Sequence, residues 1–103
     1  MQQPTGYGVV FVTVASEQEA KAIAQAVVEA KLAAAVSLSP IHSIYRWQGE
    51  IYKENEWQLV MKINLALFST LEAKITELHS YQLLEIIALT ILLSSPTYQQ
   101  WIS

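Results

Sequence analysis

The chain of 103 residues contains no cysteine, which excludes disulfides, thiolate nucleophiles and cysteine-based zinc or iron–sulfur sites. Positive charge is also scarce, because six Lys and Arg stand against nine Asp and Glu. With a net charge of -3 the sequence lacks the basic stripe that binds a phosphate backbone, so nucleic acid is not an expected partner. The longest apolar run, Ile86–Leu93, is well short of the roughly 20 residues that cross a membrane, so no membrane partner is expected either.

The N-terminal segment lacks a positively charged region followed by an apolar stretch, so it does not read as a signal peptide. We therefore expect a cytoplasmic protein, with residues 1–6 as a disordered tail. The length is typical of one domain, and residues 1–103 are expected to form it.

Hydrophobic periodicity predicts an α+β domain. Ser16 followed by Glu19 is a capping-box pattern that predicts the start of a helix. The first and last strands are continuous apolar runs, which are typical of strands buried on both faces beneath helices. The predicted elements are a strand at Tyr7–Val14, a helix to about Lys31, strands at Ala33–Trp47 and Ile51–Ile63, a helix at Leu65–Leu78, a strand at Glu85–Leu93 and a short helix from Ser94-Ser95-Pro96 to Trp101. This order is the split βαβ arrangement of ferredoxin-like sandwiches.

The two middle strands are predicted to pair as a long hairpin that turns at Gly49. Fifteen extended residues span about 50 Å, whereas a compact domain of this size is nearer 30 Å across, so the hairpin should project as an arm. In the return strand, alternation places Glu54, Glu56, Gln58 and Lys62 on a face expected to be wet.

Aromatic side chains gather on this arm, and in a monomer they would be left in water. A closed homo-oligomer would cover both these rings and the free strand edge. The alternative is that Pro40 splits the run into two shorter strands that fold back into one small core. The expected interface residues are Tyr45, Trp47, Tyr52, Trp57 and, in the terminal helix, Trp101.

Several segments together resemble one family, the CutA proteins, named for divalent-cation tolerance. The resemblance runs from Val9 to Ile102 and is carried by Val12–Val14, Lys31–Ala34, Ser43–Gly49, Leu78–Tyr81, Glu85–Leu89 and Tyr98–Ile102. It implies a ferredoxin-like homotrimer whose long hairpins reach neighbouring subunits, similar in architecture to PII signalling proteins.

The chain departs from the family pattern at a few positions. Ala35 stands where members often have a cysteine, so a thiolate copper ligand cannot operate there. Ser80 and Leu84 replace the usual prolines of the loop, and Ile63 replaces a common threonine. Loss of the prolines should leave the loop more flexible in the unfolded chain.

His79 and Glu85 are the candidate metal ligands, because imidazole suits copper and zinc and a carboxylate completes a divalent site. Two ligands fall short of a closed set, so another subunit would have to supply more. Alternatively, His79 caps the second helix, where a cation near the C-terminus is favourable, and Glu85 hydrogen-bonds the loop.

Lys62, Arg46 and Tyr81 are the candidate residues of a cleft between subunits, where a cation could bind an anion or pair with a glutamate. The leading hypothesis is a non-enzymatic homotrimer that binds divalent cations, copper above others, in metal tolerance or homeostasis. The competing hypothesis is a PII-like signalling or scaffold trimer that binds a small anionic metabolite in that cleft.

Overall fold

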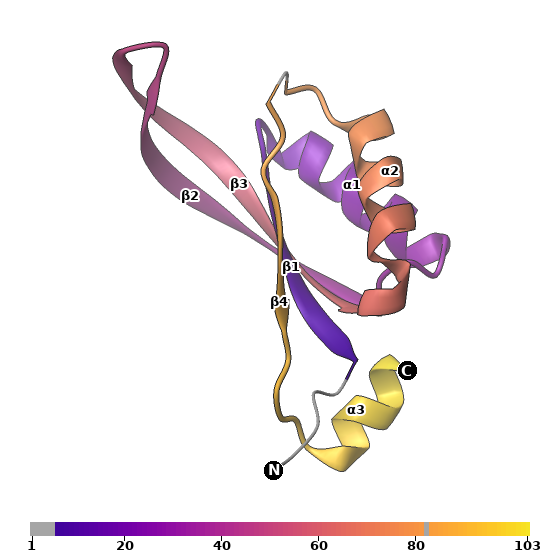
Figure 1. The fold of residues 1–103 in the computed structure, drawn as a ribbon. Helices are drawn as coiled ribbons and strands as arrows, with labels where there is room; N and C mark the ends of the chain where they lie inside the picture. The colour runs from indigo at the N-terminus through magenta and orange to yellow at the C-terminus, as the bar shows by residue number, and fades with distance from the viewer. Residues whose placement is uncertain (1–5, 82) are drawn as a thin grey trace.

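The computed structural model describes residues 6–81 and 83–103. The elements, in order, are β1 (Tyr7–Val14), α1 (Glu17–Glu29), β2 (Ala35–Trp47), β3 (Glu50–Asn64), the 3-10 turn η1 (Leu65–Leu67), α2 (Phe68–Leu78), β4 (Ile86–Thr90) and α3 (Pro96–Ile102). The strands form one antiparallel sheet in the order β2-β3-β1-β4, and α1 and α2 lie together on one of its faces (Figure 1). The predicted ferredoxin-like α+β architecture is confirmed.

The core lies between the helices and the even-numbered residues of β1. Val10, Val12 and Val14 are fully buried there and pair with Met61, Leu59 and Trp57 of β3. Helices α1 and α2 close the layer with Ile23, Val27, Leu71 and Ile75. The opposite face of β1 is less enclosed, since Val9 and Phe11 are half-buried.

Helix α1 begins as the capping pattern predicts but ends earlier than expected. The Ser16 hydroxyl accepts a hydrogen bond from the Glu19 N–H at 3.1 Å. The expectation of a helix to Lys31 was wrong by about two residues, because the chain leaves the helix after Glu29 and Lys31 adopts a left-handed φ of 61°. Residues 1–5 of the expected disordered tail lie outside the described residues.

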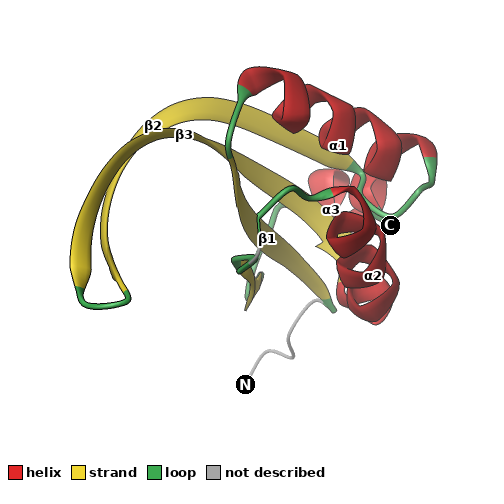
Figure 2. Ribbon diagram, turned by 90° about the horizontal axis from the view of Figure 1, so that it is seen from above, coloured by secondary structure: helices red, strands yellow, loops and turns green. Residues whose placement is uncertain are grey.

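The hairpin of β2 and β3 is continuous and projects from the body of the molecule (Figure 2). Its register is unbroken from Ala35↔Lys62 to Trp47↔Glu50, so Pro40 does not split β2 into two strands. β2 is an edge strand, where a residue without an N–H is tolerated. The molecule is 44 Å long in its longest dimension, as the projecting arm requires.

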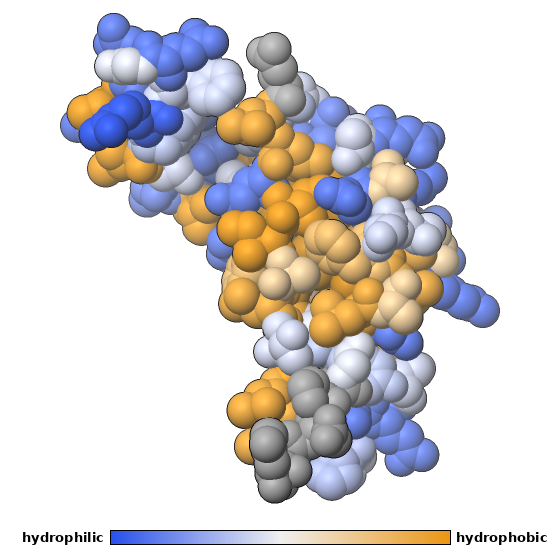
Figure 3. All heavy atoms as spheres, viewed as in Figure 1, coloured by the Kyte–Doolittle hydropathy of each residue, from blue (hydrophilic) through white to orange (hydrophobic). Residues whose placement is uncertain are grey.

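The last strand differs from its prediction in length and burial. β4 covers Ile86–Thr90 rather than Glu85–Leu93, and it pairs only with β1 at the edge of the sheet. Ile87 and Leu89 are 48% and 54% exposed, so the expectation of a strand buried on both faces was wrong for this single chain. Figure 3 shows the resulting apolar surface around β4. In residues 6–81 and 83–103, no helix is both long and apolar enough to cross a membrane.

Candidate functional site: an acidic, aromatic cleft beneath the hairpin

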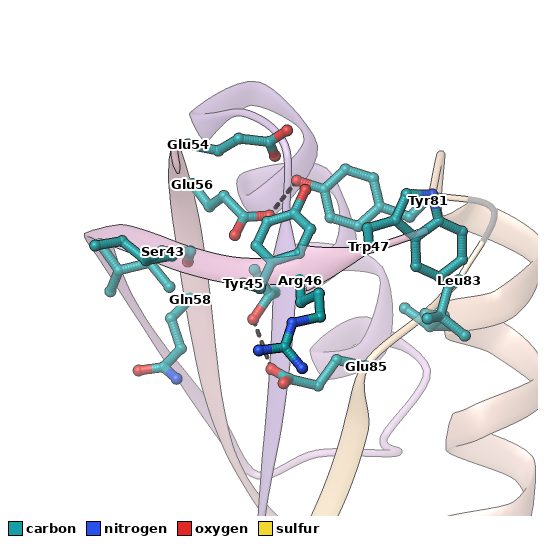
Figure 4. Close-up of a pocket in the computed structure, with 14 residues that line it drawn as sticks. Ser43, Tyr45, Arg46, Trp47, Glu54, Glu56, Gln58, Tyr81, Leu83 and Glu85 are labelled. Atoms are coloured by element: carbon teal, nitrogen blue, oxygen red, sulfur yellow. Dashed lines mark hydrogen bonds between the residues drawn. The ribbon is translucent and has the colours of Figure 1, made fainter. Parts of the chain in front are cut away.

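An open cleft of about 860 Å³ lies between the hairpin and the segment that leads into β4. The hairpin contributes one wall, and Tyr81 with residues 83–85 contributes the other (Figure 4). Carboxylates from Glu54, Glu56 and Glu85 line this cleft, whereas Arg46 is the single positively charged residue among its described lining residues. The cleft is therefore acidic.

Glu56 is the most buried of these carboxylates. Its residue is 6% exposed, although alternation along β3 had placed it on the wet face. That expectation was wrong because Tyr81 packs over this part of the strand and donates a hydrogen bond from its hydroxyl to Glu56 Oε2. Burial, and then the hydrogen bond to Glu56, raise the pKa of Tyr81 well above its ordinary value of 10.0.

Tyr45 faces the same cleft from β2. Its ring stacks on that of Tyr52, its partner across the hairpin, with centroids 5.6 Å apart and planes at 18°. Partial loss of solvent and the neighbouring Glu54 carboxylate raise the pKa of Tyr45. The stack fixes the orientation of the Tyr45 ring at the cleft.

His79 lies behind the cleft with both ring nitrogens engaged. Its side chain is 1% exposed. Nδ1 accepts the Tyr81 N–H at 2.9 Å, so Nε2 carries the proton and donates to the Thr13 carbonyl at 2.7 Å. The ring therefore holds Tyr81 in place and is not a free metal donor in this single chain.

The position of His79 follows from the end of the β1–β4 ladder. Tyr7 accepts a hydrogen bond from Ile91 on the β4 side, and alternate residues of a strand direct their carbonyls the same way. Pairing with β4 ends at Val12↔Ile86, so the Thr13 carbonyl lies beyond the last paired residue. His79 supplies its donor instead. His79 is the C-cap residue of α2, as the alternative expected, and its ring bonds to the Thr13 carbonyl and to the Tyr81 N–H.

Thr13 also binds Glu85, because its hydroxyl donates to Glu85 Oε2 at 2.8 Å. His79 and Glu85, the two expected metal ligands, are thus joined through one threonine. In residues 6–81 and 83–103, no group of three His, Cys, Asp or Glu side chains is arranged to hold a metal ion. A complete metal site would need ligands from another molecule.

The other expected site residues fall in different places. Arg46, Tyr45, Trp47 and Tyr81 line the cleft, whereas Lys62 is not among its described lining residues. Trp57 pairs with Pro40 and Val14 and packs against the core, on the other face of β3 from Glu56. Trp101 is 59% exposed on α3, where it stacks on Tyr98.

Thr13, Glu19 and Glu56 are site residues that sequence reasoning did not assign. Glu19 accepts hydrogen bonds from the Ser80 N–H at 2.8 Å and from the Ser80 hydroxyl at 2.9 Å. In a capping box the glutamate side chain bonds to the backbone N–H of the N-cap residue. Here the Glu19 side chain ties the 79–81 segment to α1. In the sequence, Glu56 is one of several alternating polar residues of its strand. The same pattern is found in any strand with a solvent-exposed face, so it did not mark Glu56 as a site residue.

Comparison with known proteins agrees with this fold. The family model for the CutA1 divalent ion tolerance protein matches residues 8–103. The chain belongs to the CutA family. The divalent-cation tolerance protein CutA of Thermus thermophilus is 42% identical over 95 residues, covering 91% of this chain and 92% of that protein. Protein CutA of Mus musculus is 39% identical, and the match covers 96% of this chain but 56% of the mouse protein.

Solved CutA structures share the same backbone. The Thermus thermophilus structure matches with a TM-score of 0.91 at 41% identity, covering 93% of this chain and 94% of that one. The CutA structure of Synechococcus elongatus matches with a TM-score of 0.89 at 42% identity, covering 93% and 86% of the two chains. CutA relatives carry names that place them in different compartments, such as chloroplastic in Arabidopsis thaliana and periplasmic in Archaeoglobus fulgidus. Family membership connects this chain to divalent-cation tolerance at a general level.

Proposed function

We propose that this chain acts as a non-enzymatic homotrimer that binds divalent cations in the acidic cleft and thereby contributes to metal tolerance. The observation that supports the proposal is that Glu54, Glu56 and Glu85 all line one open cleft, although the three do not form a ligand set by themselves. Carboxylate oxygens are hard ligands suited to divalent ions. Since residues 6–81 and 83–103 of one chain contain no closed ligand set, neighbouring subunits would complete the coordination.

The homotrimer is supported by the exposed apolar surface. Ile87 and Leu89 on β4, and Ile44 and Ile51 on the hairpin, are each about half or more exposed in the single chain. Exposed apolar patches often mark protein interfaces. A trimer would cover it and would bring a second chain to the open side of the cleft.

The preferred metal depends on His79. Imidazole is the donor that suits copper, yet both nitrogens of His79 are hydrogen-bonded. Copper binding through His79 would require release of Tyr81 or of the Thr13 carbonyl. Glu85, by contrast, lines the cleft and keeps one oxygen beyond its hydrogen bond to Thr13. We therefore propose Glu85 as a ligand and copper as one of several divalent ions bound.

The competing anionic-metabolite function is less consistent with the cleft. Arg46 would be the single described cation available to the anion, against three carboxylates. Like charges on a ligand and its site cost free energy and slow association. An anion would need positive charge supplied by a neighbouring subunit.

The test is calorimetric titration of metal-free protein with Mn²⁺ and, separately, Cu²⁺. Glu85→Gln and Glu54→Gln keep the side-chain size but remove charge, and each should weaken binding at least tenfold, or about 1.4 kcal/mol. Glu72→Gln, at an exposed position on α2, is the matched control and should bind as the wild type does. His79→Ala should lower Cu²⁺ affinity more than Mn²⁺ affinity if the imidazole takes part. Unchanged affinity in both cleft variants would refute the proposed site.

A further inference from the structure

The aromatic walls of the cleft are not explained by a divalent ion. Tyr45, Trp47 and Tyr81 line the cleft together with the carboxylates (Figure 4). Hydrated divalent ions are bound by oxygen atoms, and ring faces contribute nothing to their coordination. Three rings that line the same cleft as these carboxylates indicate a ligand with both a charged and an apolar part.

Glu56 supplies a buried charge without a counter-charge. It is 6% exposed, and its described hydrogen bond is to the neutral hydroxyl of Tyr81. Among the described residues, neither Glu56 nor Arg46 takes part in an ion pair, and the described pair of Lys21 with Glu17 lies elsewhere, on α1. Burying an unpaired carboxylate is costly, so a cation beside Glu56 would be stabilising.

Two of the three rings are held in place by contacts within the chain before any ligand binds. Tyr45 is stacked on Tyr52, and Tyr81 is held by its N–H bond to His79 and its hydroxyl bond to Glu56. Rings fixed in this way bind at a lower entropic cost than mobile ones. The cleft, at about 860 Å³, is within the size range of small-molecule sites.

We propose that this cleft binds a small organic cation that carries a methylated ammonium group. The ring faces of Tyr45, Trp47 and Tyr81 attract the charge through their quadrupoles and contact the methyl groups, while Glu56 supplies the counter-charge. This inference rests on the proposed function only in that both place a ligand in the same cleft. The organic cation needs the aromatic rings, whereas the metal ion does not. It adds a second class of ligand to the cleft.

The experiment is calorimetric titration of the whole protein in EDTA with choline as the probe. Its neutral isostere 3,3-dimethyl-1-butanol, which has the same shape without the charge, is the matched ligand. Choline should bind saturably and at least tenfold more tightly than the alcohol. Equal binding of the two ligands, or no choline binding by the wild type, would overturn the inference.

Variants locate the site. Trp47→Leu and Glu56→Gln should each weaken choline binding at least fivefold, and Gln at position 56 still offers an oxygen to Tyr81. Trp101→Leu removes an exposed ring outside the cleft and should bind choline normally. Trp47 lies near the hairpin tip, away from the core, so Trp47→Leu should fold normally. It therefore still tests the inference if Glu56→Gln fails to fold. Unchanged choline affinity in Trp47→Leu would overturn the inference.

The two proposals fail separately. Trp47→Leu should lose choline but still bind Mn²⁺, whereas Glu54→Gln should weaken Mn²⁺ more than choline. Choline binding without any Mn²⁺ binding would remove the proposed function and leave this inference. Mn²⁺ binding without choline binding would overturn this inference and leave the proposed function in place.

Discussion

The hydroxyl of Tyr81 joins the two walls of the cleft, because Tyr81 follows α2 and its acceptor Glu56 lies on β3. Removing that hydroxyl in Tyr81→Phe leaves a buried carboxylate without its described hydrogen-bond partner. We expect a loss of about 1–3 kcal/mol in the free energy of unfolding at pH 7, measured by guanidinium denaturation. Tyr98→Phe, at a 40% exposed position, is the control and should change stability little.

The same tyrosine predicts a pH dependence. Its pKa is raised in the folded protein above the ordinary value of 10.0, so folding favours the protonated phenol. This contribution is fully present below pH 10 and is lost as the pH rises through 10 toward the folded-state pKa. The wild type should therefore lose stability between pH 9 and 11 more steeply than Tyr81→Phe, as guanidinium midpoints at each pH would show. Parallel curves for the two proteins would contradict this assignment.

Gly8 is required for close packing in β1. A Cβ atom there would lie 2.4 Å from a side-chain carbon of Leu65 and 2.9 Å from the backbone oxygen of Leu89. The oxygen belongs to the paired strand and cannot move aside. Gly8→Ala should therefore lower the free energy of unfolding by about 1–3 kcal/mol in chemical denaturation. Thr90→Ala, at the exposed position opposite Gly8, should have a much smaller effect.

At the scale of elements, periodic patterns predicted most of the fold. The apolar positions of α1 and β1 face one core, and the polar Ser16 begins α1 by capping it, so local and tertiary signals agree there. The prediction was wrong where burial depends on another segment. Nothing in the sequence around Glu56 indicates that Tyr81 will cover it, and the apolar residues of β4 indicated burial that one chain alone does not provide.

The candidate site was predicted in composition but not in arrangement. Arg46, Tyr81 and Glu85 do line one cleft, yet His79 serves as a donor to Thr13 at the end of a strand ladder. That role depends on where β4 stops pairing with β1, and strand ends are poorly marked in a continuous apolar run. The tie from Glu19 to Ser80 joins residues 61 apart, which no local pattern could indicate.

The hydrogen bonds between Glu19 and Ser80 connect α1 to the segment that carries Tyr81. Glu19→Ala removes both acceptors of Ser80 and should speed hydrogen exchange of the Ser80 amide at least tenfold, since hydrogen bonds to charged groups contribute about 1.5–3 kcal/mol. Glu17→Ala is the matched control, because Glu17 is in the same helical turn and its described ion pair is with Lys21 of the same helix. Equal protection of Ser80 in both variants would show that the segment is held by other contacts.

At the scale of the whole molecule, the single chain leaves apolar side chains of β4 in water. Under the proposed function, the described residues also leave the cleft short of metal ligands. One assembly of three chains would address both, because each neighbour could cover β4 and bring further groups to a cleft.

Native mass spectrometry should find a mass near three times 11.6 kDa. Ile87→Lys, which places a charge on the exposed face of β4, should shift the population to monomers because a lysine buried at an interface is costly. Leu78→Lys, at a 39% exposed position on α2, should remain trimeric. If Ile87→Lys stayed trimeric as well, β4 would not be the interface, and the ligands missing from the cleft would have to come from a different contact between subunits.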